Sequence, residues 1–262
     1  MIPENYLREW KEHAPWKTDG MVEQDLIICR SLVILFANPV LSNHLAFRGG
    51  TALHKLHLAP ARRYSEDIDL VQSVSGPIGP IFDALRVSLD PLLGKPQRKQ
   101  GPGVVTLTYR TAGTGQASPT LRLKVEINSR EHFAVLGPES RPFSVSTRWF
   151  TGSCSVSTYR LEELLGTKLR ALYQRRKGRD LFDLWLGLTA GKAQPDLIAQ
   201  CFRRYMEASG LRVTGREYRL NMEQKLTHPD FLHDTDDLLR PGIAFDIAGA
   251  YAKLDQEVLA WF

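Results

Sequence analysis

The sequence predicts an α+β protein, with an N-terminal α/β part in residues 1–157 and a helical C-terminal part in residues 158–262. Two observations support this prediction. Runs rich in β-branched residues, with the period-two alternation of strands, all lie in the first 160 residues. From Leu161 onward, leucines recur at the i, i+3, i+4 spacing of an amphipathic helix. A chain of 262 residues accommodates one large domain or two small ones.

The first elements follow from apolar spacing and helix breakers. Residues 1–45 are expected to be helical, with a break at Pro39. Gly-Gly precedes Thr51, which opens or caps a short helix that stops near Pro60. Residues 66–72 alternate in the manner of a strand whose apolar side is buried.

The second half of the N-terminal part predicts a helix followed by strands. Residues 77–93 return to helical spacing, and residues 103–111 and 120–128 are candidate antiparallel strands. Gly115 and Pro119 lie in the connection between these two strands. The segments "FSVSTRWF" and "CSVSTY" predict shorter strands, and residues 161–180 predict a helix rich in basic side chains.

Composition restricts the class of protein. Hydrophobic residues make up 43% and charged residues 24% of the chain, which is ordinary for a globular protein. No apolar run reaches the ~18 residues of a membrane span, and the polar N-terminus does not resemble a secretory signal. We therefore expect a cytoplasmic protein with no membrane partner.

The three cysteines are far apart in the sequence, which predicts free thiols. The net charge of +5 is compatible with a polyanionic partner or with a general excess of basic residues on the surface.

The stretch "RYSEDIDL" carries the first candidate site. Asp67 and Asp69 share one face of the predicted strand, about 6–7 Å apart at their Cα atoms, while Ile68 and Leu70 point the other way. Two carboxylates so placed suit Mg²⁺ or Mn²⁺, although a D-x-D pair alone is more often a solvated strand end. Glu126, in the apolar strand "LKVEIN", joins them if the two strands are neighbours.

Two further stretches suggest phosphate binding. Gly49 and Gly50 allow close approach of backbone to a phosphate, although a Gly-Gly-Thr sequence alone is usually only a turn. Lys168 interrupts an apolar helical face, which predicts an anion nearby; Asp180 is placed to orient Lys168 or Arg179. A surface helix with ordinary basic side chains is the alternative interpretation.

In combination, "FRGGTALHKLH", "RYSEDIDL", "LKVEIN" and "LEELLGTKLRALYQRRKGRDLFDLW" resemble the AbiEii/AbiGii family of toxins in bacterial toxin–antitoxin and abortive-infection systems. That family belongs to the nucleotidyltransferase superfamily that includes DNA polymerase β. The resemblance covers about residues 45–190 and implies a nucleotidyltransferase α/β domain with a mixed sheet, followed by a helical domain that contributes a basic helix to the active site.

The resemblance also implies residue roles. Asp67 and Asp69 would hold the metal ion, with Glu126 as the third carboxylate. Gly49, Gly50 and Thr51 would bind the triphosphate of an NTP, and Ser65 would border the nucleotide or be modified. Lys168 would bind a phosphate and Asp180 would position the basic helix. Candidates for contacts with RNA are Arg175, Arg176, Lys177 and Arg179.

The implied activity is transfer of a nucleoside monophosphate to the 3′ end of the tRNA acceptor stem, which blocks translation, with a cognate antitoxin as partner. Two alternatives stay open at this point. One is a small-molecule nucleotidyltransferase of the kind that modifies antibiotics, and the other is a catalytically silent RNA- or protein-binding module on the same fold.

Overall fold

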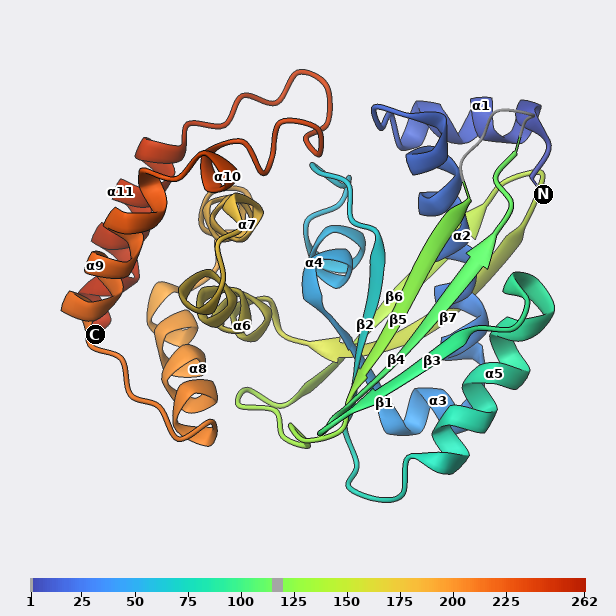
Figure 1. Cartoon of the computed structure of the whole chain (residues 1–262), viewed down its shortest axis with the longest axis horizontal. Coiled ribbons are helices and arrows are strands. Elements are labelled where there is room, and N and C mark those ends of the chain that lie inside the picture. The colour runs from blue at the N-terminus through green and yellow to red at the C-terminus, as the bar shows by residue number, and fades with distance from the viewer. Residues whose placement is uncertain (1, 115–119) are drawn as a thin grey trace.

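A mixed seven-stranded sheet forms the centre of the N-terminal part (Figure 1). The computed structural model describes residues 2–114 and 120–262. Within these residues the strand order is β3-β4-β5-β2-β1-β7-β6. The strands are β1 (Leu45–Arg48), β2 (Asp67–Gln72), β3 (Gln97–Gly101), β4 (Val104–Thr111), β5 (Leu121–Asn128), β6 (Pro138–Ser146) and β7 (Thr151–Tyr159).

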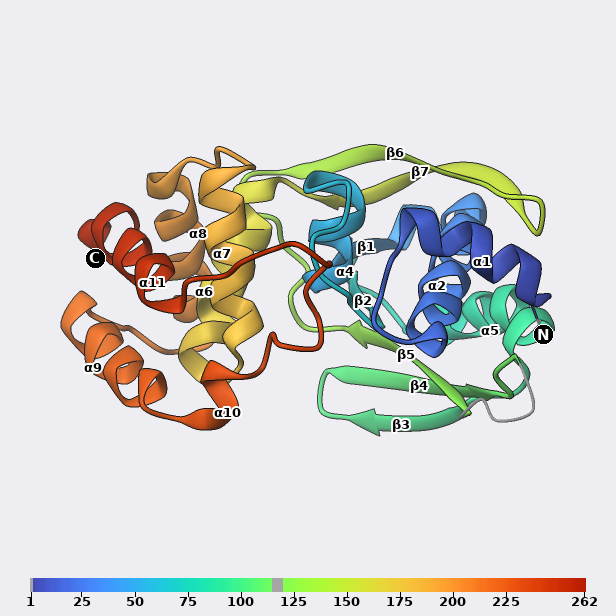
Figure 2. The ribbon, with the colours of Figure 1, turned by 90° about the horizontal axis from the view of Figure 1, so that it is seen from above.

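Helices cover one face of the sheet and continue beyond it as a separate group (Figures 1 and 2). The N-terminal helices are α1 (Glu4–His13), α2 (Asp19–Ala37), α3 (Pro39–His44), α4 (Gly49–Ala52) and α5 (Gly79–Leu93). A π-helical turn, η1 (Leu53–His57), continues α4. The C-terminal helices are α6 (Leu161–Gln174), α7 (Gly178–Thr189), α8 (Pro195–Ala208), α9 (Gly215–Leu226), α10 (Pro229–Leu232), α11 (Ile247–Glu257) and the 3-10 turn η2 (Leu259–Trp261). The predicted fold class is thus confirmed.

The pairing of β2 with β5 places the candidate site. These two strands run parallel, and β5 pairs antiparallel with β4 along its other edge, as the sequence predicted for residues 103–111 and 120–128. Residues 115–119, which include Gly115 and Pro119 of the connection between β4 and β5, lie outside the described residues. On the covered face, Ile68, Leu70 and Val125 are almost completely buried in the core that α2 and α5 complete.

Several elements differ from the sequence-based expectation. β6 and β7 are nine residues each, longer than the short strands predicted from "FSVSTRWF" and "CSVSTY". β1 is not predicted: the helical segment is expected to run to residue 45, and the next three residues are too few to show strand alternation. β3 was not predicted, since "QRKQG" has no apolar residue and owes its extended form to pairing with β4. The expected single helix over residues 161–180 is two helices, because Arg175 and Lys177 have extended backbone between α6 and α7.

The change from strands to helices falls close to the expected boundary between residues 157 and 158. β7 ends at Tyr159 and α6 begins at Leu161. That the two parts are separate domains stays a prediction. In the described part of the chain, no helix is both long and apolar enough to cross a membrane.

Candidate active site

Two aspartates of β2 share the face of the sheet opposite α2 and α5, beside the short helix α4 (Figure 1). Asp67 and Asp69 are half-buried, and the residue between them, Ile68, is buried in the core. In the register of β2 with β5, Asp67 stands opposite Lys124 and Asp69 stands opposite Glu126. Neighbours in such a register point to the same side. The structure therefore brings together the three carboxylates that the sequence singled out, on one open face.

Lys124 lies among these carboxylates. Its Nζ is 3.2 Å from Oδ2 of Asp67 and 3.6 Å from Oε2 of Glu126. Burial raises the pKa of Asp67 to about 6; the Lys124 ammonium opposes this shift and the Asp69 carboxylate adds to it. Burial lowers the pKa of Lys124, but the surrounding carboxylates outweigh it and raise that pKa overall. The ammonium of Lys124, paired with Asp67 and Glu126, thus offsets part of the repulsion among the carboxylates.

These donors fit a divalent metal ion that completes its coordination with substrate. Mg²⁺ typically takes one or two carboxylates together with phosphate oxygens, and Asp67 and Asp69 supply two carboxylates on one face. Among residues 2–114 and 120–262, no three His, Cys, Asp or Glu side chains form a group that would hold a metal by themselves. A metal here would need the triphosphate as a further ligand, and the ammonium of Lys124 would have to move from Asp67.

The glycine pair makes room for two functional side chains. Gly49 has φ +80°, and a Cβ there would collide with Oδ2 of Asp69. A Cβ on Gly50 would collide with Nη2 of Arg63 and come 3.2 Å from Oγ of Ser65. Only glycine allows both approaches. The glycine pair therefore sets how close Asp69 and Arg63 come to the start of α4. Its expected contact with a phosphate stays a separate prediction.

The hydroxyl of Thr51 is directed inward. Thr51 is 1% exposed, and its Oγ1 lies 2.6 Å from the carbonyl oxygen of Asp67 and 2.8 Å from Oγ of Ser65. These bonds join α4 to the first residue of β2 and place Ser65 at the rim of the site. The expected contact of Thr51 with a phosphate stays a prediction. In this structure its hydroxyl instead holds the aspartate strand.

Behind the glycine pair lies a cluster of ion pairs and hydrogen bonds, buried except for the half-exposed Arg175. We call it the α6–α7 cluster: Arg63, His54, Lys168, Arg175, Asp180 and Asp183. Nζ of Lys168 is 3.0 Å from Oδ1 of Asp180 and 3.0 Å from Oδ2 of Asp183. Arg175 binds both oxygens of Asp180 at 2.7 and 2.8 Å, and Arg63 binds both oxygens of Asp183 at 2.7 and 2.6 Å. Bidentate pairing fixes each guanidinium as well as neutralising it.

The pKa directions in the α6–α7 cluster describe a charged network around a neutral histidine. Burial raises the pKa of Asp183, but Arg63 and Lys168 outweigh it and hold that pKa well below its usual range. Burial lowers the pKa of His54 to about 4, against the Asp183 carboxylate that raises it. Its Nε2 lies 2.9 Å from Asp183, so the neutral ring donates from Nε2.

A small cavity of about 150 Å³ lies where these groups meet. Its lining combines the carboxylate face with the cationic ends of the cluster: Gly50, Arg63, Ser65, Asp67, Asp69, Lys124, Glu126, Lys168, Arg175 and Arg179 among others. We call it the carboxylate pocket. Acidic groups on one wall and cations on the other suit a metal-bound phosphate chain.

The remaining basic residues of the α6–α7 junction separate into two groups. Asp180 binds Lys168 and Arg175, so of its two expected partners, Lys168 and Arg179, it pairs with Lys168. Arg179 instead binds Asp234 through its backbone N–H at 3.0 Å. Lys177 also pairs with Asp234, at 3.3 Å. Arg176 is exposed, and within the described residues it has no ion pair. Contacts of these side chains with RNA stay predictions.

A family model described as the nucleotidyl transferase AbiEii toxin of type IV toxin–antitoxin systems matches residues 30–251. The chain belongs to the AbiEii nucleotidyltransferase toxin family. The match includes the carboxylate pocket and the α6–α7 cluster, so the resemblance seen in the motifs is confirmed.

Two solved structures share the fold of this AbiEii-family chain. MenT4, a nucleotidyltransferase toxin of Mycobacterium tuberculosis, is 18% identical with a TM-score of 0.66, over 100% of this chain and 89% of its own. JHP933 of Helicobacter pylori is 16% identical with a TM-score of 0.59, over 93% of this chain and 92% of its own. No curated protein sequence matches the chain.

Four residues of this AbiEii-family site were not singled out from the sequence: His54, Arg63, Lys124 and Asp183. Signals for two of them were present. Lys124 has the same strand parity as Glu126, and Asp183 follows Asp180 by three residues, on the same side of a helix. Arg63 and His54 gave no such signal, because their roles depend on the path of the loop between η1 and β2.

Proposed function

We propose that this toxin transfers a nucleoside monophosphate from an NTP to the 3′ end of a tRNA, with Mg²⁺ or Mn²⁺ as cofactor. One observation carries the proposal: Asp67 and Asp69 line the same small cavity as Lys168 and Arg175. A metal-binding wall and a phosphate-binding wall then face each other, which is the arrangement that phosphoryl transfer needs.

The cations of the carboxylate pocket differ in what they can offer a phosphate. Arg175 uses Nε and Nη2 for Asp180, and its Nη1 makes no hydrogen bond to the described part of the chain. Its side chain is 50% exposed, whereas that of Lys168 is 8% exposed and lies between two carboxylates. We therefore assign the direct phosphate contact to Arg175. Lys168 holds Asp180 and Asp183 in place and adds positive charge to the wall of the pocket behind Arg175.

The transfer step is an in-line displacement. The acceptor hydroxyl oxygen forms a bond to the α-phosphorus, the bond from that phosphorus to the bridging oxygen breaks, and pyrophosphate leaves. Asp67 and Asp69 would hold a divalent ion, which, when bound, neutralises charge on the phosphate oxygens. Glu126, opposite Asp69, is placed to take the proton of the attacking hydroxyl.

A nucleotide added to the 3′ end would prevent aminoacylation of the tRNA, which accounts for toxicity. A cognate antitoxin is the partner that a toxin of this family implies. A small-molecule acceptor is the alternative that the transfer assay also tests. Location in the cytoplasm stays a prediction.

The test is transfer of labelled NTP to total tRNA in the presence of Mg²⁺. The wild-type protein is expected to label tRNA, and Asp67→Ala and Asp69→Ala are expected to lower the rate by at least about a thousandfold, since each removes a metal ligand. Asp83→Ala, an exposed aspartate of α5, is the matched control and should retain full activity. Near-normal turnover by either β2 variant would overturn the metal assignment. Label on a small molecule but not on tRNA would favour the alternative acceptor.

A further inference from the structure

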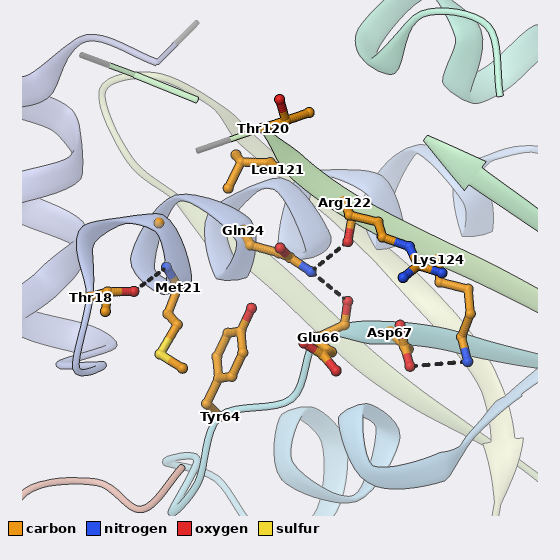
Figure 3. A pocket seen from close by; sticks show the side chains of 11 residues that line it. Thr18, Met21, Gln24, Tyr64, Glu66, Asp67, Thr120, Leu121, Arg122 and Lys124 are labelled. Carbon is orange, nitrogen blue, oxygen red and sulfur yellow. Dashed lines mark hydrogen bonds and ion pairs between the residues drawn. The ribbon is translucent and has the colours of Figure 1, made fainter. Parts of the chain in front are cut away.

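A second, larger cavity shares a wall with the carboxylate pocket. It has a volume of about 420 Å³ and lies between the start of α2, the loop before β2 and the start of β5 (Figure 3). Tyr64, Glu66, Asp67 and Lys124 line both cavities. The ion pair of Asp67 with Lys124 therefore stands between the two, and we call the larger one the α2 pocket.

The two cavities differ in what they can hold. At about 150 Å³ the carboxylate pocket is below the ~300–1,000 Å³ usual for small-molecule sites, whereas the α2 pocket lies within that range. The α2 pocket presents the side chains of Met21, Tyr64 and Leu121 next to polar groups (Figure 3). Apolar and aromatic surface of this kind suits a base, because every nucleobase has a flat face that stacks.

The walls of the α2 pocket are held by one buried amide. Nε2 of Gln24 donates to the carbonyl oxygen of Glu66 at 2.8 Å and to that of Arg122 at 3.1 Å (Figure 3). Gln24 is 7% exposed. It therefore ties the loop before β2 to the start of β5 and fixes the width of the pocket beside Asp67.

The geometry of phosphoryl transfer decides which substrate belongs there. In an in-line displacement the attacking and leaving oxygens lie on opposite sides of the phosphorus. The pyrophosphate leaving group belongs with the cations of the carboxylate pocket, so the attacking hydroxyl approaches from the other side of the metal-binding aspartates. The α2 pocket, across the Asp67–Lys124 wall, lies on that side.

Basic side chains continue outward from the α2 pocket over the open face of the sheet. Arg122 of β5 stands opposite Arg110 of β4, and Lys99 of β3 lies on the same face. All three are exposed, and in the described part of the chain none of them forms an ion pair. A strand of nucleic acid whose end entered the α2 pocket would run its phosphates along these cations.

We propose that the α2 pocket binds the terminal nucleoside of the RNA acceptor, with its hydroxyl toward Asp67 and its preceding phosphates toward Arg122 and Arg110. This proposal rests on the proposed function and adds where the acceptor binds. Gln24 acts as a positioning residue, and Tyr64, Met21 and Leu121 form the surface against the base.

The test fills the pocket without disturbing the backbone. A Cβ on Gly20, which lines the α2 pocket, would lie 3.8 Å from Leu121 and 3.9 Å from Thr18, both ordinary contacts. Gly20→Leu therefore places a side chain in the cavity. Gly79→Leu is the matched control, since Gly79 also lies in the first turn of a helix and a Cβ there meets nothing within 4 Å.

The ligands are two acceptor-stem RNAs that differ only at the 3′ end, one with a complete terminal nucleoside and one with an abasic ribose. Wild-type protein and Gly79→Leu should bind the complete RNA at least about fivefold more tightly than the abasic RNA. That factor corresponds to the lower limit of the stacking energy of one base on an aromatic side chain. Gly20→Leu should bind both RNAs equally, with melting temperature and Mg²⁺–NTP affinity unchanged. Equal binding of the two RNAs by wild type, or full discrimination by Gly20→Leu, would overturn the proposal. A selective loss of NTP affinity in Gly20→Leu would overturn it too, because the pocket would then hold the NTP base.

Binding and transfer are measured separately, so the two proposals fail in different ways. Discrimination between the RNAs without any transfer of label would contradict the proposed function and leave the acceptor subsite standing. Transfer that proceeds equally in wild type and Gly20→Leu at low RNA concentration would contradict the subsite and leave the function standing.

Discussion

At the scale of single residues, Asp67 combines a backbone role and a charge role. Its carbonyl oxygen accepts the hydroxyl of Thr51, and its carboxylate lies 3.2 Å from Nζ of Lys124. Burial raises the pKa of this carboxyl to about 6, the Lys124 ammonium opposes the shift, and the nearby Asp69 adds to it. In the absence of metal, the ionised form of Asp67 is therefore less favourable in the folded protein than in the unfolded chain.

A pH dependence of stability follows. Because the folded-state pKa of Asp67 is higher than its usual value near 3.8, the stability linked to its proton is present below that value and is lost as the pH rises through about 6. Asp67→Asn removes this dependence. Without metal, its melting temperature relative to wild type should rise between pH 4 and pH 8. For Asp83→Asn, on the exposed side of α5, the difference in melting temperature from wild type should be the same at pH 4 and at pH 8. A difference for Asp67→Asn that stays flat with pH would contradict the assignment.

The residue scale is also where the sequence was most informative. Period-two alternation correctly placed Asp67 and Asp69 on one side of a strand and Ile68 in the core. It also placed Lys124 on the same side as Glu126, but not beside Asp67. That contact depends on the register of β2 with β5, in which Asp67 pairs with Lys124, more than 50 positions later in the sequence. Local patterns carry no information on such a register.

At the scale of elements, the break between α6 and α7 creates the cation side of the site. Asp180 and Asp183 are three residues apart on α7 and turn the same side toward Lys168 of α6. A helix that continued unbroken from residue 161 through Asp183 would keep Lys168 and Asp183 too far apart along its axis to meet. The sequence showed the basic residues but not the break, because the segment contains no proline, and of its two glycines Gly166 lies inside α6 and Gly178 begins α7.

A second ion-pair group attaches α6 to the sheet. Glu131, just after β5, binds Arg48 at the end of β1 and Arg170 of α6, each at 2.6 Å. Burial raises the pKa of Glu131, but the two arginines outweigh it and lower that pKa overall. Since Arg48 directly precedes Gly49, this group fixes α6 relative to the glycine pair.

Lys168 is predicted to have both a structural and a functional role. Lys168→Met should lower the free energy of unfolding by about 3 kcal/mol, which is the low end of the range for a broken buried ion pair. The low end is expected because Asp180 still pairs with Arg175 and Asp183 still pairs with Arg63. The affinity for Mg²⁺–NTP should fall as well. Urea unfolding and calorimetry measure the two effects independently.

Lys177→Met is the matched control for Lys168→Met. Lys177 pairs with Asp234 at 3.3 Å, but its side chain is 45% exposed, so its loss should cost less than about 1 kcal/mol. If Lys168→Met unfolds at the same urea concentration as Lys177→Met, the buried pairs contribute nothing to stability. If NTP affinity is unchanged, Lys168 is purely structural.

At the scale of the whole molecule, the C-terminal part returns to cover the site. Tyr64 N–H donates to the carbonyl oxygen of Leu238 at 2.8 Å, and Arg240 N–H donates to that of Arg62 at 2.9 Å. Leu238 lines the carboxylate pocket. In Figure 2 this segment runs from the helical group back across to the loop before β2. The contact joins residues more than 170 positions apart, and no sequence pattern indicated it.

The molecule offers two basic surfaces to an RNA. One is the α6–α7 junction with Arg176 and Lys177, which the sequence indicated, and the other is the open sheet face with Lys99 and Arg110. On the junction Lys177 is already paired with Asp234, whereas both cations of the sheet face are free of ion pairs within the described residues. We expect the sheet face to contact the strand that enters the α2 pocket and the junction to contact RNA farther from its 3′ end.

Salt dependence of acceptor-stem binding tests both surfaces. Each phosphate contact contributes roughly 0.7–0.9 to the slope of log affinity against log salt, so Lys99→Ala/Arg110→Ala should reduce that slope by roughly 1.4–1.8. Arg176→Ala/Lys177→Ala should reduce it by roughly 0.7–0.9, because the ion pair of Lys177 competes with phosphate. Arg212→Ala/Arg216→Ala removes two exposed charges from the C-terminal helical part and should leave the slope unchanged. An unchanged slope in Lys99→Ala/Arg110→Ala would show that the acceptor does not cross the open sheet face. A full reduction in Arg176→Ala/Lys177→Ala would then make the α6–α7 junction the main RNA-binding surface.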